Sequence, residues 1–140
     1  MSITVTRDVS APMKHVIAIR GHQITVDEPE ANGGQDAGPD PHDLYDAALG
    51  ACKALTVVWY ANRKGIPLRA VEVVVERDQT REKLGVYGLT ATLSLGGELT
   101  EAQRQTLLAV AAKCPIHRLM SELSTEIHTA LAPSTEGSQP

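Results

Sequence analysis

The sequence contains no phenylalanine and few other aromatic residues. One tryptophan and three tyrosines are its only aromatic side chains among 140 residues. A chain of this length can still bury a stable core, so valine, leucine, isoleucine and alanine must fill it. The final residues are polar or proline, a composition that does not support a packed structure. We therefore expect one domain over residues 1–132 and a flexible tail over residues 133–140.

Long hydrophobic runs and an excess of basic residues are also missing. The longest apolar run without a charge, residues 54–62, is far shorter than the roughly 20 residues of a membrane-spanning helix. The start, "MSITVTRDVS", lacks the apolar segment of a secretory signal. The formal net charge is -4, whereas nucleic-acid binding requires basic surfaces. We expect a soluble, cytoplasmic protein with neither a membrane nor a nucleic acid as its partner.

Cysteine is scarce, with Cys52 and Cys114 as the only two thiols. In a reducing compartment such a pair is more often free or redox-active than a structural disulfide. Cys114 and His117 are spaced like half of a zinc site, but a structural zinc site needs four ligands, usually including a second close pair. No other histidine lies close to a cysteine in the sequence. Thiol chemistry is therefore favoured over a metal site.

The pattern of apolar residues predicts both strands and helices. Strand-like runs occupy the first third of the chain, and a loop rich in glycine and proline, "PEANGGQDAGPDP", follows them. The order strands, helix, strands, helix, strand predicts an α+β fold with helices packed on antiparallel sheets. The expected strands are residues 3–9, 15–20, 22–28, 70–76, 88–95 and 125–131.

Local signals mark the ends of the predicted helices. Asp40 is a good N-cap, Pro41 suits the first helical position, and Gly65 fits the position after the last turn. Thr100 and Gln103 form a capping box for the next helix. The sequence thus predicts one long helix that ends before Gly65 and a second that runs to about residue 113.

The long helix is apolar on most sides. Its polar exceptions, Asp46, Lys53, Tyr60 and Lys64, recur at spacings of seven, seven and four residues. They therefore share one narrow stripe, which we expect to face water. The apolar residues on the remaining sides predict that the helix is buried at the centre of the fold. On a chain this small, a second subunit is one way to cover it.

Cys114 precedes Pro115, which disfavours a helical conformation for the residue before it. Cys114 should therefore end one helix and cap the next, where exposed N–H groups and the helix dipole lower a thiol pKa. His117 adds a possible positive charge. The alternative is a packed cysteine at a proline kink. Cys52, among small residues in mid-helix, is open to a similar alternative, that of a buried thiol acting as a small apolar side chain.

Two stretches resemble the OsmC/Ohr family of osmotically inducible and organic hydroperoxide resistance proteins. They are "GPDPHDLYDAALGACKALTVVWYANRKGIPL" and "LTEAQRQTLLAVAAKCPIHRLM". The resemblance covers residues 32–131 and is closest to the OsmC-like branch. It implies an intertwined homodimer with its sites at the subunit interface, built around a long buried central helix.

The resemblance also implies a chemistry for the two thiols. Cys52 would be the peroxidatic cysteine, which attacks an organic hydroperoxide, or hydrogen peroxide, and becomes a sulfenic acid. Cys114 would be the resolving cysteine, which condenses with it to a disulfide. An external thiol or dithiol would then reduce the pair, without metal or flavin cofactor. The family places this chemistry in the response to oxidative and osmotic stress.

The family's activating residues have imperfect counterparts in this sequence. Members often carry a glutamate before the first helix, paired with an N-terminal arginine. Here His42 and Asp43 occupy that stretch, and Arg20 is the candidate arginine. Asp43 is nine residues from Cys52, about 13.5 Å along a helix axis. It can therefore act on the thiol only through a long cationic side chain, and it can equally serve as part of a helix cap.

A substrate pocket is expected from apolar residues near the thiols. Leu49, Trp59 and Met120 would suit an organic hydroperoxide better than hydrogen peroxide. The same pocket also fits a different hypothesis, a non-catalytic module that holds a small apolar ligand at a dimer interface and has inert cysteines. The reactivity of the thiols separates the two.

Overall fold

A three-stranded antiparallel sheet begins the chain in the computed structural model, which describes residues 1–133. Its strands β1 (Ile3–Arg7), β2 (His15–Ile19) and β3 (His22–Val26) lie side by side in sequence order. Ile17 of β2 lies opposite Ile24 of β3. The three predicted N-terminal strands are confirmed, and each ends earlier than the apolar pattern indicated.

The glycine- and proline-rich loop after β3 is organised by one buried carboxylate. Asp27 accepts hydrogen bonds from the backbone N–H groups of Glu28, Gln35 and Ala37 at 2.8, 3.2 and 3.1 Å. These bonds, that of Ala37 above all, lower the pKa of Asp27. A single 3-10 turn, η1 (Glu30–Asn32), lies inside the loop. The loop therefore leads to the long helix along a defined path.

The long helix α1 (Pro41–Lys64) begins and ends where the sequence predicts. The Asp40 side chain accepts from the Asp43 N–H at 2.8 Å, and the Asp43 side chain accepts from the Asp40 N–H at 3.1 Å. This reciprocal capping box satisfies two free donors at the helix start. Gly65 closes the other end with φ 66°, a left-handed conformation that glycine adopts without strain.

A long hairpin follows the helix. Strands β4 (Leu68–Asp78) and β5 (Gly88–Gly97) pair antiparallel, with Val73 opposite Leu93. The short η2 (Glu82–Leu84) lies at the hairpin tip. As predicted, alternate residues of β5 are the more buried ones and share one face. These are Leu89, Ala91, Leu93 and Leu95.

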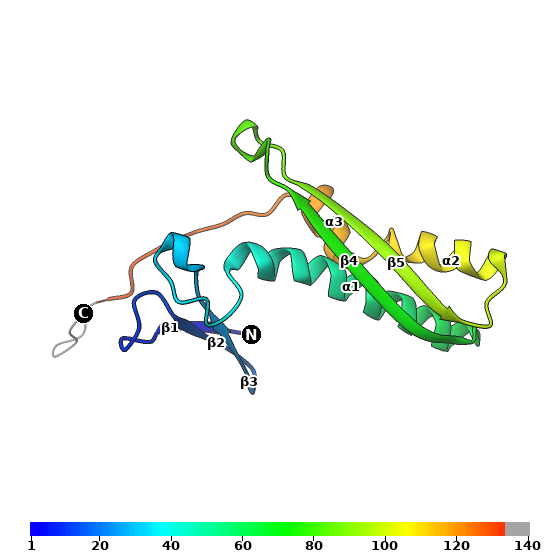
Figure 1. Cartoon of the computed structure of the whole chain (residues 1–140), viewed down its shortest axis with the longest axis horizontal. Coiled ribbons are helices and arrows are strands. Elements are labelled where there is room, and N and C mark those ends of the chain that lie inside the picture. Colours follow the sequence, from blue (N-terminus) through cyan, green and yellow to red (C-terminus); the bar gives the residue numbers. More distant parts are fainter. Residues whose placement is uncertain (134–140) are drawn as a thin grey trace.

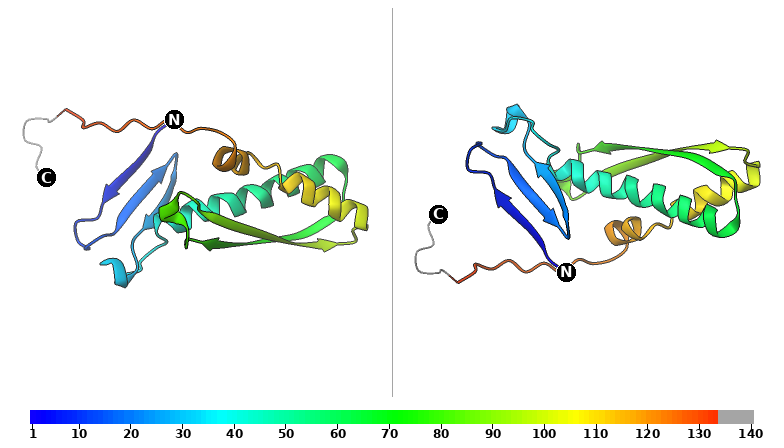
Figure 2. Two further views of the ribbon diagram at one scale, coloured as in Figure 1. Left: turned by 90° about the horizontal axis from the view of Figure 1, so that it is seen from above. Right: turned by 90° about the horizontal axis from the view of Figure 1, so that it is seen from below.

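The remaining helices, α2 (Glu101–Ala111) and α3 (Pro115–Ser121), return along α1. The predicted capping box at the start of α2 is confirmed. Figures 1 and 2 show α1 lying along the hairpin with α2 beside it, while the N-terminal sheet lies apart near the start of α1. Residues of both α1 and α2 form the most deeply buried part of the core, which leucines and a valine of the hairpin extend. The fold is thus α+β with antiparallel sheets, as predicted.

The predicted strand over residues 125–131 is wrong, because this segment forms no strand. The segment runs away from the rest of the chain along an extended path (Figure 1). Its Ile127 and Leu131 are 79% and 98% exposed. A strand requires a neighbouring edge for its backbone hydrogen bonds, and no described strand pairs with this segment. Except for Pro133, the predicted tail over residues 133–140 lies outside the described residues.

The predicted solvent-facing stripe of α1 is wrong at two of its four residues, since Lys64 is exposed and Tyr60 is half-buried. Asp46 and Lys53 are buried, whereas Leu55 and Trp59 are 70% and 58% exposed. The two charges can be buried because each has hydrogen-bond partners on the hairpin or on α2 and α3. The helix therefore turns polar residues inward and several apolar residues outward. Even so, no helix within residues 1–133 is long and apolar enough to cross a membrane.

Candidate thiol site

Cys52 lies in the middle of α1 and is half-buried. Its sulfur accepts a hydrogen bond from the Ile116 N–H at 3.5 Å and lies 4.0 Å from the Thr56 Oγ1. Small residues surround it, and Gly50 is one of them. A Cβ at Gly50 would come within 3.0 Å of a methyl group of Val75. The helix therefore approaches β4 closely at Gly50.

Cys114 is the N-cap of α3, as predicted from Pro115, whereas α2 already ends at Ala111, before Cys114. Its backbone is extended, with φ -63° and ψ 149°, and its sulfur accepts from the His117 N–H at 3.4 Å. The side chain is fully buried. Burial raises the pKa of Cys114, and the His117 N–H offsets this only in part. The predicted lowering of this pKa is wrong, because loss of solvation outweighs the contribution of the cap.

The two sulfurs lie at the same turn of the chain. Cys52 accepts from the N–H of Ile116, and Cys114 accepts from the N–H of the next residue, His117. Both cysteines are free thiols, and the neighbouring Cys52 contributes to the raised pKa of Cys114. Two thiols that are distant in sequence are therefore brought to adjacent hydrogen-bond donors.

Lys53 reaches the same turn and was not predicted to do so. Its Nζ donates to the Ala111 carbonyl at 2.9 Å and lies 2.9 Å from His117 Nδ1. The position of Lys53 directly after Cys52 was the only signal in the sequence. Residues 1–133 contain no group of three or more histidine, cysteine or acidic side chains arranged to hold a metal ion. His117 instead has one ring nitrogen occupied by Lys53.

A second polar cluster lies nearer the start of α1. Arg77 of β4 donates through Nη2 to Asp43 Oδ1 at 2.6 Å and through Nε to Asp46. Tyr87 donates its hydroxyl to Asp46 at 2.8 Å, and burial together with this carboxylate raises the pKa of Tyr87 to about 12. The Asp40 N–H and then Arg77 lower the pKa of Asp43. Asp43 is thus both a cap and the partner of an arginine, and that arginine was not predicted.

Arg20, the predicted activating arginine, lies elsewhere. It is exposed in the turn between β2 and β3, with φ 54°. Among the described residues it takes part in no ion pair. Within one chain, the structure therefore brings Cys52 and Cys114 together and joins Asp43 to Arg77, and it does not bring Arg20 to them.

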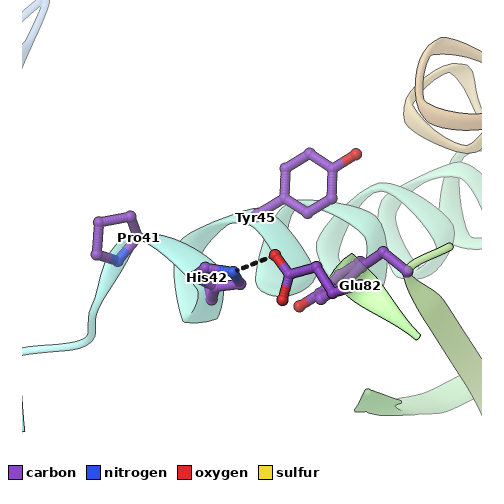
Figure 3. Close-up of a pocket in the computed structure, with 5 residues that line it drawn as sticks. Pro41, His42, Tyr45 and Glu82 are labelled. Atoms are coloured by element: carbon purple, nitrogen blue, oxygen red, sulfur yellow. Dashed lines mark hydrogen bonds and ion pairs between the residues drawn. The ribbon is translucent and has the colours of Figure 1, made fainter. Parts of the chain in front are cut away.

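His42 joins the start of α1 to the hairpin tip. Its Nε2 lies 3.1 Å from Glu82 Oε1, a contact visible in Figure 3. The hydrogen bond to Glu82 raises the pKa of His42 and lowers that of Glu82. The pair borders a cavity of about 290 Å³ that is also lined by Pro41, Tyr45 and Tyr87. His42 is therefore a link between two elements.

A larger cavity of about 480 Å³ lies between α1, α3 and the hairpin. Leu49 and Met120 line it, as predicted, together with His117. Trp59 does not line it. Its ring is exposed, and Arg63 Cζ lies 5.1 Å from its centroid. Neither cysteine lines this cavity, although His117 connects its wall to the turn that holds both sulfurs.

Comparisons with known proteins agree with the fold. Solved structures with the same fold include an OsmC-like protein from Mycoplasma pneumoniae, with 20% identity, a TM-score of 0.70 and coverage of 87% of each chain. The organic hydroperoxide resistance protein OsmC from Legionella pneumophila is 20% identical, with a TM-score of 0.62 over 87% of this chain and 90% of that one. The organic hydroperoxide resistance protein OhrB of Bacillus subtilis is 22% identical, with a TM-score of 0.56 over 87% and 92%.

At these identities the structural likeness concerns the fold alone. No match was found among curated protein sequences. A family model, described as OsmC-like protein, matches residues 33–129, which is more than half of the chain and includes both cysteines. The protein therefore belongs to the OsmC-like family.

Proposed function

We propose that the protein is a thiol peroxidase that reduces organic hydroperoxides, with Cys52 as the attacking and Cys114 as the resolving cysteine. The observation that carries this proposal is the meeting of both sulfurs at the consecutive N–H groups of Ile116 and His117. Two structurally similar proteins are named organic hydroperoxide resistance proteins, which supports the same substrate class and a role in stress resistance.

The reaction needs only the two thiols and an external reductant. The Cys52 thiolate attacks one oxygen of the O–O bond, alkoxide leaves and takes up a proton as the alcohol, and Cys52 becomes a sulfenic acid. The Cys114 sulfur then attacks the Cys52 sulfur, and the sulfenic hydroxyl leaves with the Cys114 proton as water. A thiol or dithiol finally reduces the disulfide. Cys114 suits the resolving role because its backbone is extended and lies beyond the last residue of α2.

The cavity between α1, α3 and the hairpin would hold the organic part of the substrate. Its wall combines apolar side chains with polar ones, which include His117 and Ser121 near the thiol turn. Apolar walls favour an alkyl or aryl hydroperoxide over hydrogen peroxide because they gain from burying carbon. The apolar residues are Leu49, Val86, Leu89 and Met120, with Tyr45 and Tyr87 beside them.

A homodimer forms part of the proposal. Apolar side chains that a monomer leaves exposed include Leu55 and Trp59 on α1 and Leu108 on α2, and large exposed apolar patches mark interfaces. Light scattering should return twice the 15.0 kDa chain mass. A monomer mass at micromolar concentration would contradict this part of the proposal.

The activating charge proposed for Cys52 is that of Arg20. Arg20 would act on Cys52 from the N-terminal sheet of a second copy, since it makes no described ion pair within its own chain. Asp43, already held by Arg77, would help to fix the start of α1. Arg20→Ala should then lower the rate of the first oxidation without changing the fold.

The decisive experiment is hydroperoxide consumption with a dithiol reductant. Wild-type protein should consume an organic hydroperoxide catalytically, and Cys52→Ser should not, because no attacking thiol remains. Hydrogen peroxide, tested in parallel, should be the poorer substrate. Equal consumption by wild type and Cys52→Ser would exclude a peroxidase that works through Cys52.

Two observations favour a second candidate function, a non-catalytic module that binds a small apolar ligand. Cys114 is fully buried with a raised pKa, and neither cysteine lines the larger cavity. If this function is correct, the native protein should react with a thiol reagent no faster than free cysteine does. It should also form no intramolecular disulfide on mild oxidation. Rapid disulfide formation would reject it.

A further inference from the structure

Lys53 is a buried lysine whose hydrogen-bond partners are all uncharged or basic. It is 5% exposed, and lysine is almost never buried unless it is paired. Its contacts are the Ala111 carbonyl and the His117 ring. Among residues 1–133, no carboxylate lies within ion-pair distance of it. Burial of a positive charge without a counter-ion is costly, so the charge requires an explanation.

The contacts of Lys53 surround Cys114. The Ala111 carbonyl accepts from both Lys53 Nζ, at 2.9 Å, and the Cys114 N–H, at 3.3 Å. On the other side, His117 faces Lys53 with its ring and donates its backbone N–H to the Cys114 sulfur. Lys53 thus holds the segments before and after Cys114 at the same time. The group beside it that can become an anion is a thiol.

The contact between Lys53 and His117 also limits the charge at this place. Two nitrogens 2.9 Å apart share one hydrogen-bonding proton, so one must donate and the other accept. With Lys53 as donor, His117 Nδ1 is unprotonated and its proton is on Nε2. The pair then carries a single positive charge. As the donor, Lys53 is the cationic partner in this contact.

We propose that Lys53 is a positioning residue that fixes the Cys114 turn against α1 and supplies the counter-charge for the Cys114 thiolate. The inference rests on the proposed function for its purpose. When the Cys114 thiol gives up its proton and its sulfur attacks the Cys52 sulfenic acid, the proton and the sulfenic hydroxyl leave as water. Lys53 keeps its own protons throughout and lowers the energy of the thiolate between these events.

Electrostatics around Cys114 agree with this role. The charge of Lys53 opposes the rise in the Cys114 pKa that burial causes. The ionisable side chains around this sulfur are Cys52 and Lys53 from α1 and His117 from its own turn. Loss of the Lys53 charge should therefore raise the pKa of Cys114 further, because the effect of burial is then opposed by no lysine.

The test is a titration of Cys114 that requires no peroxide. In a Cys52→Ser background Cys114 is the only cysteine, so isotope labelling of cysteine gives one NMR signal for its Cβ, which reports the thiolate. Lys53→Gln removes the charge but keeps an N–H donor for the Ala111 carbonyl. We expect the Cys114 titration to move up by about one pH unit, the lower end of the effect of a neighbouring opposite charge.

Matched variants separate charge from structure. Lys64→Gln removes an exposed lysine near the end of the same helix and should leave the titration unchanged. Lys53→Arg keeps the charge and should titrate closer to the parent than Lys53→Gln does. Circular dichroism and thermal unfolding identify any variant that fails to fold. If Lys53→Gln does not fold, Lys53→Met provides the neutral side chain of similar length.

The outcomes decide this inference independently of the proposed function. An upward shift in the neutral Lys53 variants alone supports the counter-charge even if the protein consumes no hydroperoxide. An unchanged titration in a folded neutral Lys53 variant overturns it, even if peroxidase activity is found. An equal shift in Lys64→Gln overturns it as well, because the effect would then come from net charge.

Discussion

Two segments of α1 hold charged side chains in opposite ways. Near its start, Asp43 and Asp46 share the guanidinium of Arg77, so every charge has an opposite charge at hydrogen-bonding distance. Two turns later, Lys53 is buried against a carbonyl and an imidazole. A charge that is paired with its opposite chiefly holds elements together. A charge without a counter-ion remains available to a group that ionises.

This difference between the two segments indicates which part of α1 takes part in thiol chemistry. The first segment fixes the hairpin to the start of α1 through Arg77, Tyr87 and Asp46. The second segment contains Cys52 and Lys53, and both side chains make hydrogen bonds to the segment around Cys114. If the comparison is right, changes in the second segment should alter thiol chemistry more than stability, and changes in the first should do the reverse.

The largest expected effect comes from Cys114→Ser. Without a resolving thiol, Cys52 should be oxidised once and then remain a sulfenic acid or oxidise further. Mass spectrometry after one equivalent of organic hydroperoxide should show about one or two added oxygen atoms at Cys52. In Cys52→Ser, Cys114 should gain none. The reverse pattern would exchange the two roles. If neither variant is oxidised faster than free cysteine, the protein is not a peroxidase.

Asp46→Ala should be the most destabilising change in the first segment. It leaves the half-buried Tyr87 hydroxyl and one Arg77 contact without their acceptor, the buried Asp46 carboxylate. We expect a loss of about 2 kcal/mol in the free energy of unfolding, typical of a buried donor left unsatisfied. Urea denaturation measures it, with Glu72→Ala, an exposed carboxylate on β4, as the control. A loss equal to that of the control would show that this cluster does not stabilise the fold.

The smallest expected effect is the pH dependence of the His42–Glu82 link. Glu82 raises the pKa of His42, so this contribution is complete below 6.5 and disappears as pH rises through the higher folded value. His42 lowers the pKa of Glu82, so that contribution is present above 4.5 and disappears as pH falls through the lower folded value. The His42–Glu82 contact should therefore stabilise the fold most between pH 4.5 and 6.5.

His42→Gln tests this window. Wild type should exceed the variant in stability most clearly between pH 4.5 and 6.5, and the difference should shrink toward alkaline pH. Unfolding by urea at a series of pH values gives the difference directly. Because both side chains are partly exposed, the effect should be smaller than that of Asp46→Ala. A difference that does not vary with pH would assign His42 a purely steric role.

Helix ends were the features best predicted from the sequence. Asp40 and Asp43 start α1, and Gly65 ends it. Cys114 caps α3 because Pro115 follows it. Each of these outcomes depends on residues within a few positions of one another, so the necessary information is contiguous in the chain.

The orientation of α1 could not be predicted in the same way. Its regularly spaced polar residues identified one stripe, but Asp46 and Lys53 of that stripe turned out to be buried. Whether a polar stripe faces water depends on partners such as Arg77 and His117, which lie far away in the sequence. Hydrophobic periodicity identifies a face of a helix and does not say what the face contacts.

The sequence by itself determined the family resemblance, the helix boundaries and the two thiols as candidates, because these depend on residue types and short-range spacing. Only the tertiary structure decided that the sulfurs of Cys52 and Cys114 meet, that Arg77 is the partner of Asp43, and that Lys53 reaches the thiol turn. It also reversed the expected direction of the Cys114 pKa. Burial and long-range contacts set these properties, and both arise only when distant segments pack together.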